Sequence, residues 1–371
     1  MHTGIGLQFA NLDGTATDAE TYRRELDLAA RAEKAGFDSV WGSEHHFSDY
    51  QLTSQTPMFL SWLAGQTTHV KLGTFVTVLP WHDPVRVVES FSVLDHLSGG
   101  RAILGIGRGL GRVEFNGFRQ EMGESRRRFA EYSEAILEAL ETGYIEHDGE
   151  LYQQPRVPIR PRPFASYKGR TFASAVSPQS MELMARLGVG IMVIAQKPWE
   201  TTQTELADYR LRYAEINGAE APKPVLVVVV GVSRDRRGSQ RMRDVYLQRW
   251  ARSTVEHYEF DNRGFAEIEG YEYYGGLANN IAKHGLENFN GFLADLQVWG
   301  TPEQVTEKLL DYVRRTDAGA LVVPLSFGGM PPEEARANFD LFTAEVLPEL
   351  QRHDVGGDIG VTYGVTPAEV R

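Results

Sequence analysis

Residues 36–47 read Gly-Phe-Asp-Ser-Val-Trp-Gly-Ser-Glu-His-His-Phe: a turn residue, a short apolar run and then a polar cluster. Gly36 stands where a residue with positive φ commonly ends a helix, and residues 37–42 predict a buried β-strand. The preceding segment completes the unit, because residues 5–10 predict a strand and residues 19–35 carry apolar side chains at helical spacing. Strand, helix and strand are therefore closed within about forty residues, as in a βαβ motif.

The same alternation continues along the chain. Apolar runs predict further strands over residues 70–79, 102–105, 171–176, 191–195, 225–232 and 320–325. Helices are predicted over residues 85–97, 124–141 and 180–187. The predicted strands are mostly continuously apolar, as strands buried on both faces must be. Their number and order favour an α/β fold built as a closed (β/α)₈ TIM barrel over an open, doubly wound sheet.

Two long insertions interrupt this alternation. Residues 144–169 are rich in Pro and Arg, and residues 257–292 are rich in Gly, Tyr and Asn. Insertions that follow barrel strands lie at the C-terminal rim, so the second one is interpreted as a candidate mobile lid. Residues 1–350 are expected to form a single domain, with a C-terminal tail over residues 351–371.

Composition and charge restrict the class of protein and of partner. With 371 residues, 42% hydrophobic and 24% charged, the chain has the composition of a soluble globular protein. Its formal charge of −12 disfavours binding to nucleic acid or to anionic membranes. It has no cysteine for a disulfide or a thiolate, no membrane-spanning apolar run and no secretory signal. A cytoplasmic protein that acts on a small molecule is expected.

Glu44, His45 and His46 directly follow the strand over residues 37–42, at the end of a barrel strand where catalytic groups gather. The histidines could handle protons, or they could simply hydrogen-bond the rim. A zinc site needs three or four ligands, and neither His-x-His nor His-Glu-x-x-His occurs nearby. A metal is therefore disfavoured.

Three further segments offer ligands for an anion. Residues 105–112, Gly-Ile-Gly-Arg-Gly-Leu-Gly-Arg, combine glycines that permit close approach with two arginines, although their spacing is not a dinucleotide fingerprint. Residues 125–128, Ser-Arg-Arg-Arg, begin a helix. Residues 177–180, Ser-Pro-Gln-Ser, begin another, and a helix N-terminus can bind a phosphate. A flexible rim loop, a solvated arginine face and plain capping are the alternatives for the three segments.

The quoted segments resemble the luciferase-like flavin-dependent monooxygenases, and in particular the α subunit of bacterial luciferase. Residues 36–47 match Gly-Phe-Asp-x-Val-Trp-x-x-Glu-His-His-Phe, and residues 72–86 match Gly-Thr-x-x-x-x-Leu-Pro-x-x-x-Pro-Val-Arg. Residues 94–110, which end in Gly-Ile-Gly-Arg-Gly-Leu, match a third stretch. Weaker similarity continues through residues 299–302 and the last helix.

The resemblance implies a chemistry and a set of partners. Reduced FMN would come from a separate NAD(P)H:flavin reductase, O₂ would be the co-substrate, and a C4a-peroxyflavin would oxygenate a small, largely apolar molecule. His45 matches the family's catalytic histidine, and Glu44 and His46 match its supporting residues. Many relatives form homodimers through the early barrel helices, so a homodimer is expected.

The resemblance also implies which residues bind the flavin. Positions near its phosphate or its ring, including a non-prolyl cis peptide beneath the isoalloxazine at residues 75 and 76, are matched by Phe75, Val76, Arg108, Glu114, Arg126, Val176, Ser177, Ser180 and Trp250. Two positions depart from the family: its reactive cysteine is Gly107 here, and a pocket tryptophan is Ala195. A larger substrate cavity is therefore expected, and light emission is not.

Two other functions stay open on the same residues. A sister family uses the deazaflavin F420 for dehydrogenation on the same barrel, but the Glu-His-His-Phe segment favours the FMN branch. A non-catalytic flavin-binding protein is the second alternative. It is disfavoured because storage of a flavin requires no histidine at the rim.

Overall fold

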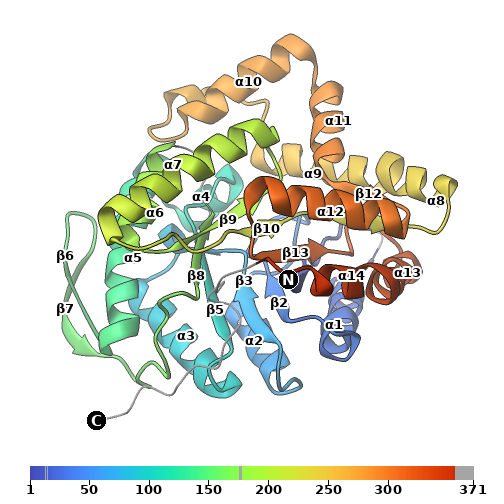
Figure 1. The fold of residues 1–371 in the computed structure, drawn as a ribbon. Coiled ribbons are helices and arrows are strands. Elements are labelled where there is room, and N and C mark those ends of the chain that lie inside the picture. Colours follow the sequence, from blue (N-terminus) through green and yellow to red (C-terminus); the bar gives the residue numbers. More distant parts are fainter. Residues whose placement is uncertain (13, 15, 175–177, 356–371) are drawn as a thin grey trace.

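The computed structural model describes residues 1–12, 14, 16–174 and 178–355, and a closed barrel of parallel strands lies at its centre (Figure 1). β13 pairs with both β10 and β1, and β3 pairs with β5, so the ring has no open edge. The predicted single-domain TIM barrel is confirmed. Its strands are β1 (His2–Leu7), β2 (Ser39–Gly42), β3 (Lys71–Thr74), β5 (Ala102–Gly107), β8 (Thr171–Ser174), β9 (Gly190–Ile194), β10 (Val225–Val227) and β13 (Ala320–Pro324).

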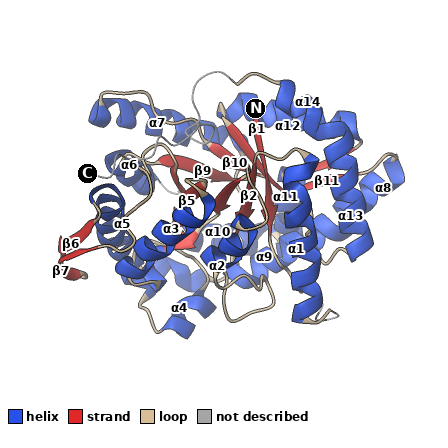
Figure 2. Cartoon of the chain, turned by 90° about the horizontal axis from the view of Figure 1, so that it is seen from below, coloured by secondary structure: helices blue, strands red, loops and turns tan. Residues whose placement is uncertain are grey.

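A ring of helices covers the outside of the barrel, as the view from below shows (Figure 2). The predicted end of α1 at Gly36, which has φ 98°, is confirmed, and a capping box of Thr17 and Glu20 begins the same helix. Within the described residues, no helix has both the length and the apolar character of a membrane span. The covering helices are α1 (Asp18–Ala35), α2 (Thr56–Ala64), α3 (Pro84–Ser98), α5 (Ser125–Thr142), α6 (Pro178–Leu187), α7 (Trp199–Asn217), α12 (Pro302–Thr316), α13 (Pro332–Leu341) and α14 (Leu347–Arg352).

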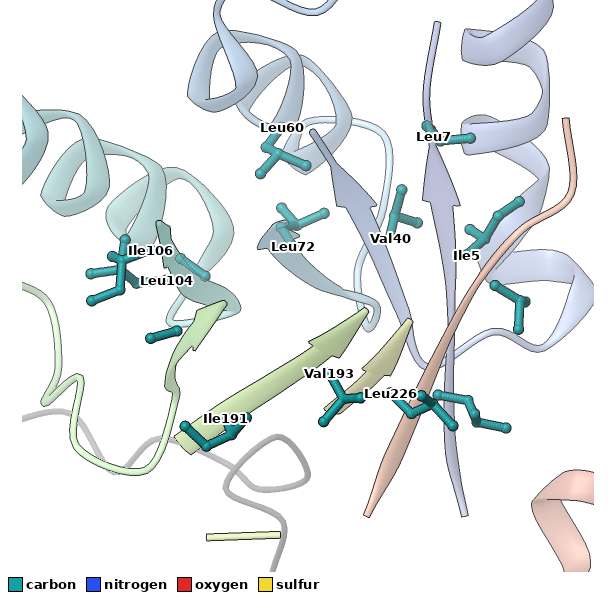
Figure 3. Close-up of a cluster of buried hydrophobic side chains, with 14 of the residues drawn as sticks. Ile5, Leu7, Val40, Leu60, Leu72, Leu104, Ile106, Ile191, Val193 and Leu226 are labelled. Carbon is teal, nitrogen blue, oxygen red and sulfur yellow. The ribbon is translucent and has the colours of Figure 1, made fainter. Parts of the chain in front are cut away.

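The strands bury both of their faces, which explains their continuous apolar runs. Side chains such as Ile5, Val40 and Leu72 point outward and pack beneath the helices (Figure 3). Trp41 points inward, and its indole ring occupies the space beside Gly4 and Gly73 on the neighbouring strands, where a Cβ atom would collide with it. Large and small residues therefore alternate between neighbouring strands inside the barrel.

Two predicted strands differ from the structure in their limits. The first was expected over residues 5–10, but β1 ends at Leu7, because Phe9 has a positive φ of 51° that no strand continues. The apolar run at residues 70–79 is two strands, β3 and β4 (Thr77–Val78), separated by a cis peptide bond between Phe75 and Val76. This is the cis bond that the family resemblance predicted.

The run at residues 225–232 also divides into two strands. β10 belongs to the barrel, whereas β11 (Val230–Val232) pairs outside it with β12 (Val298–Gly300), a strand that the sequence analysis missed. Only three residues long, β12 is too short to produce a recognisable periodic pattern.

The two insertions form regular structure and lie in different places. Residues 144–169 begin with an antiparallel hairpin, β6 (Tyr144–Asp148) and β7 (Gln153–Pro158), which packs beside α5 (Figure 1). Residues 257–292 are mostly helical: the end of α9 (Gln248–Tyr258), a 3₁₀ turn (Arg263–Glu267), α10 (Glu272–His284) and most of α11 (Leu286–Leu296). Two further short helices, α4 (Arg112–Phe118) and α8 (Arg236–Arg241), complete the rim.

Candidate functional site

A cavity of about 520 Å³ opens where the barrel strands end. Residues that follow β2, β3, β5 and β9, the starts of α5 and α6, and the second insertion line it, whereas residues 144–169 do not. The lining includes these predicted site residues: Glu44, His45, Phe75, Val76, Arg108, Glu114, Arg126 and Ser180. His46 and Trp250 are not part of the lining, and Val176 and Ser177 lie outside the described residues.

Glu44 is a buried carboxylate that fastens the wall of the cavity. Its Oε1 lies 3.0 Å from Nε2 of His46 and 2.6 Å from Nε2 of His82, and its Oε2 accepts the backbone N–H of Val78. Burial alone would raise the pKa of Glu44, but the charge of His82 and these hydrogen bonds hold it below its usual value. The Glu44 carboxylate in turn raises the pKa of His82 despite burial. Glu44 is therefore an anion that ties the β2 loop to β4.

Glu114, on α4, lies between two histidines from distant parts of the chain. Its Oε1 is 3.0 Å from Nδ1 of His45 and accepts the backbone N–H of His46, while its Oε2 is 3.6 Å from Nε2 of His257 on α9. Burial alone would raise the pKa of Glu114, but the two histidines lower it to about 2. Each of these three side chains offers one atom that could bind a metal ion, and the three atoms lie within 4.8 Å of one another.

Aromatic side chains surround His45. Tyr50 meets its imidazole edge to face at 4.8 Å between ring centroids, and the hydroxyl of Tyr258 lies 3.4 Å from its Nε2. Burial raises the pKa of Tyr50 to about 12 and raises the pKa of Tyr258 as well, so both phenols are neutral at physiological pH. One nitrogen of His45 thus contacts a carboxylate, and the other lies beside a neutral hydroxyl at the cavity.

Two arginines gather at another part of the cavity. Nη1 of Arg108 and Nη2 of Arg126 both donate to the carbonyl oxygen of Gly270, at 2.8 and 3.3 Å. The Arg108 guanidinium also lies 4.0 Å from the ring centroid of Tyr271. Nε of Arg126 is buried and has no hydrogen-bond partner among the described residues. Burial and the nearby Arg108 lower the pKa of Arg126, although the charges of Glu272 and Glu269 act in the opposite direction. This arrangement fits a phosphate group.

Three further residues that the sequence analysis singled out lie in the cavity wall or behind it. Trp250 packs in an apolar cluster behind the cavity wall, so a direct contact with a bound flavin is not evident. Ala195 is buried beside the lining residues Ile194 and Gln196. Gly107 does line the cavity, but a Cβ atom there would collide with Cγ2 of Val76. Val76 therefore partly occupies the space that a cysteine side chain at position 107 would need.

Sequence reasoning missed two histidines of this region, His82 and His257. His82 lies 38 residues from its partner Glu44, and His257 lies within an insertion that was interpreted only as a lid. His82 falls at a variable position of the matched stretch over residues 72–86, and His257 belongs to no quoted motif, so no spacing in the sequence points to them. Only the fold brings them to Glu44 and Glu114.

Comparisons with known proteins agree with the barrel and its cavity. The sequence profile of the luciferase-like monooxygenases matches residues 1–319. The alkanal monooxygenase α chain of Photobacterium leiognathi is 27% identical over 339 residues, which cover 90% of this chain and 94% of that protein. Several solved structures have the same fold. A monooxygenase from Streptomyces bottropensis superposes with a TM-score of 0.74 at 22% identity, covering 94% of this chain and all of that chain.

Two further structures differ in their cofactor. One is the oxygenating constituent of 3,6-diketocamphane monooxygenase from Pseudomonas putida, a type II Baeyer-Villiger monooxygenase in complex with FMN. Its TM-score is 0.69 at 19% identity, over 94% of this chain and 98% of that chain. The other is an F420-dependent secondary alcohol dehydrogenase, with the same TM-score at 15% identity and the same coverage. At these identities the likeness establishes the fold alone.

Proposed function

The chain belongs to the luciferase-like monooxygenase family, and from this premise we propose that it is a two-component flavin-dependent monooxygenase. It would take reduced FMN from a separate NAD(P)H:flavin reductase and use O₂ to oxygenate a small, largely apolar organic molecule. The observation that carries the proposal is one cavity with His45 at one wall and the paired cations Arg108 and Arg126 at another. Reduced FMN, when bound, would supply the electrons that activate O₂.

The residues of the cavity fit an FMN molecule. Arg126 has a buried Nε that lacks a partner among the described residues, and Arg108 lies beside it, so a phosphate dianion would satisfy both guanidinium groups. Ser180, near the start of α6, lines the same cavity. In the proposed enzyme these residues bind and orient the cofactor, and Phe75 and Val76 form part of the wall against its ring.

His45 is the proposed proton-handling residue. Its Nδ1 faces Glu114 and its Nε2 faces Tyr258 at the cavity, so a proton can be held at Nδ1 and exchanged at Nε2. Glu44 and His46 support the loop that carries it. The aromatic walls and the second insertion would exclude water from the reacting atoms.

Replacing His45 by Ala tests this role. We expect product formation to fall by two to four orders of magnitude, the range of one general acid-base group, while the dissociation constant for FMN changes little. Oxygen consumed would then appear as hydrogen peroxide, measured against product labelled from ¹⁸O₂. Equal losses of FMN affinity and turnover would make His45 a structural residue.

A second function is a deazaflavin-dependent dehydrogenase, like the F420-dependent secondary alcohol dehydrogenase that shares this fold. Both cofactors carry a phosphate group, so the arginine pair does not separate them. Titrating the protein with reduced FMN and with reduced F420 separates the two proposals, because it measures which cofactor binds more tightly. Tighter binding of F420, with no oxygen uptake, would replace the monooxygenase proposal. Tighter binding of FMN without turnover would leave the non-catalytic alternative.

A further inference from the structure

We propose that His257 is a positioning residue for His45: through Glu114 it orients the imidazole of His45 and determines how many protons the two histidines hold. This inference rests on the proposed function, in which His45 handles protons. His257 does not line the cavity, so it acts on the proposed chemistry through His45, by way of the carboxylate between them and the direct contact of the two rings.

The geometry makes Glu114 the link. Its side chain is 1% exposed, and each of its two oxygens faces a different histidine, at 3.0 Å for His45 and 3.6 Å for His257. Oε2 of Glu114 and Nε2 of His257 are both buried, and neither has a hydrogen-bond partner among the described residues. Because two such groups face each other, a proton on Nε2 of His257 would lie toward Glu114. The other nitrogen of His257, Nδ1, lies 3.2 Å from Oγ of Ser48.

Packing holds the two imidazoles in a fixed relation. Their ring centroids are 4.9 Å apart with perpendicular planes, and the ring of Tyr50 stacks on His257 at 4.3 Å. Gly111 lies against the same pair: a Cβ atom there would collide with Oε2 of Glu114 and approach Nε2 of His257 to 3.1 Å. Gly111 has an ordinary φ of −67°, so the glycine is needed for space and not for its backbone conformation.

Charge makes the two histidines depend on each other. Burial lowers the pKa of His257, the facing Glu114 carboxylate raises it, and the nearby charge of His45 lowers it again. A single carboxylate cannot fully compensate two imidazolium ions at this separation, so protonation of one histidine opposes protonation of the other. The titratable groups that face His257 from the packed elements are Glu114, His45, Tyr50, Tyr258 and Glu259.

A metal ion is the competing explanation for this cluster. It would have three protein ligand atoms, as a catalytic zinc site does, so the ligand count alone does not decide between the two explanations. Nδ1 of His45 already lies at hydrogen-bond distance from Oε1 of Glu114, which also accepts the N–H of His46. These contacts are those of a hydrogen-bonded histidine and carboxylate, so we favour the proton-linked arrangement.

NMR titration of the flavin-free protein tests the link without reference to turnover. The imidazole signals of His257 should titrate below the usual range, and His45→Gln should move the midpoint upward by on the order of one pH unit, because a neighbouring positive charge is lost. When Glu114 is also replaced by Gln, His45→Gln should move the titration midpoint of His257 much less. The control is His284→Gln, an exposed histidine of α10. An unchanged midpoint in His45→Gln would overturn the proposal.

Enzyme assays and metal titration complete the experiment. His257→Gln keeps a side-chain N–H that can face Glu114 but cannot titrate. His257→Phe has neither the N–H group nor a titratable group. We expect Gln to retain more turnover than Phe and to shift the pH profile of kcat with little change in FMN affinity; equal losses at every pH would make His257 merely structural. A Zn²⁺-dependent rise in Tm that needs His257 would replace the proposal by a metal site. Failure of FMN to bind would remove the proposed function and leave the NMR result standing.

Discussion

Glu114 is a single residue on which both the stability and the proposed chemistry of the rim depend. Its pKa, lowered to about 2 from a usual 4.5, means that folding favours the charged form. A carboxyl whose pKa is lowered by folding contributes stability above the unfolded value, and this contribution is lost as the pH falls toward the folded value. Glu114→Gln should therefore be less stable than the original chain at pH 7, with a difference that shrinks from about pH 4.5 downward.

Urea unfolding of both proteins at pH 7, 5, 4 and 3 measures this difference. Gln resembles the protonated carboxyl, so the two free energies of unfolding should converge in acid. Glu121→Gln, at a surface position just after α4, is the matched control and should show a much smaller pH-dependent difference. A difference that stays constant across this range would contradict the assigned charge of Glu114.

Arg126 should contribute to the affinity for FMN through the cofactor's phosphate. Loss of a charged hydrogen-bonding partner costs about 1.5–3 kcal/mol, so Arg126→Met should weaken FMN binding by roughly 10- to 150-fold. Riboflavin lacks the phosphate, and its binding should change little. Arg128→Met is the control, because Arg128 pairs with Glu124, just before the start of the same helix, and does not line the cavity. Flavin fluorescence quenching measures all of these constants, and equal losses for FMN and riboflavin would place the phosphate elsewhere.

Single residues differ in how far the sequence reveals them. Glu44 and His45 could be found because they belong to a local string that matches a family, and Glu114 because it matches a flavin-pocket position of that family; the fold brings the three to one cavity. His82 and His257 could not, because their partners are supplied by other parts of the barrel. What distinguishes His257 is its contact with Glu114, which is distant in the sequence, so no local spacing reveals it.

At the scale of elements, the contact between β3 and β5 depends on one glycine. A Cβ atom at Gly105 would overlap the carbonyl oxygen of Thr74, and Oγ1 of Thr74 exchanges hydrogen bonds with the backbone N–H and C=O of Gly105. The collision is with backbone, which cannot rotate away. Gly105→Ala should therefore lower the free energy of unfolding by at least about 1–3 kcal/mol, as overpacking does.

Gly276 gives a matched control for that substitution. It lies in α10, and a Cβ atom there would meet open space, so Gly276→Ala should be neutral or stabilise by up to about 1 kcal/mol. Denaturant unfolding of both variants decides the comparison. A tolerated alanine at position 105 would show that the strand contact adjusts without cost, and similar losses in both variants would show that the cost is not specific to this contact.

Elements were predictable where periodicity and end signals agree. The βαβ unit around residues 36–47 was found because its strands are apolar, its helix is amphipathic and Gly36 ends it. The limits of β1 were wrong because a positive φ at Phe9 leaves no trace in hydrophobicity. Residues 257–292 were interpreted as a lid rich in turn residues, yet they are mostly helical, since tertiary packing overrides the weak helix propensity of Gly and Asn.

At the scale of the whole molecule, alternation alone predicts the barrel, but it does not predict what covers it. The cavity lies at one end, under the second insertion, whereas α2 and α3 on the flank carry apolar side chains that no other described residue covers. Met58 and Trp62 lie one turn apart on α2, and Val93 and Leu97 lie one turn apart on α3. An apolar patch that spans two packed helices indicates a protein partner.

We therefore expect a second copy of this chain to cover α2 and α3, as the family resemblance implies. Met58 and Leu97 are 71% and 58% exposed, so replacing both by Glu should disturb the isolated subunit little while placing charges in the contact. Light scattering after size exclusion should give about 83 kDa for the original chain, twice the 41.5 kDa of one subunit, and the mass of one subunit for the double variant.

Leu211→Glu is the matched control for the dimer. Leu211 is 60% exposed on α7, which lies away from α2 and α3 in both views (Figures 1 and 2). The Leu211→Glu substitution adds a charge at an exposed apolar position outside the proposed contact, so this variant should keep the mass of two subunits. A monomeric original chain, or dissociation by Leu211→Glu alone, would contradict the proposed face. Because the cavity is built from residues of one chain, the monomeric double variant should still bind FMN.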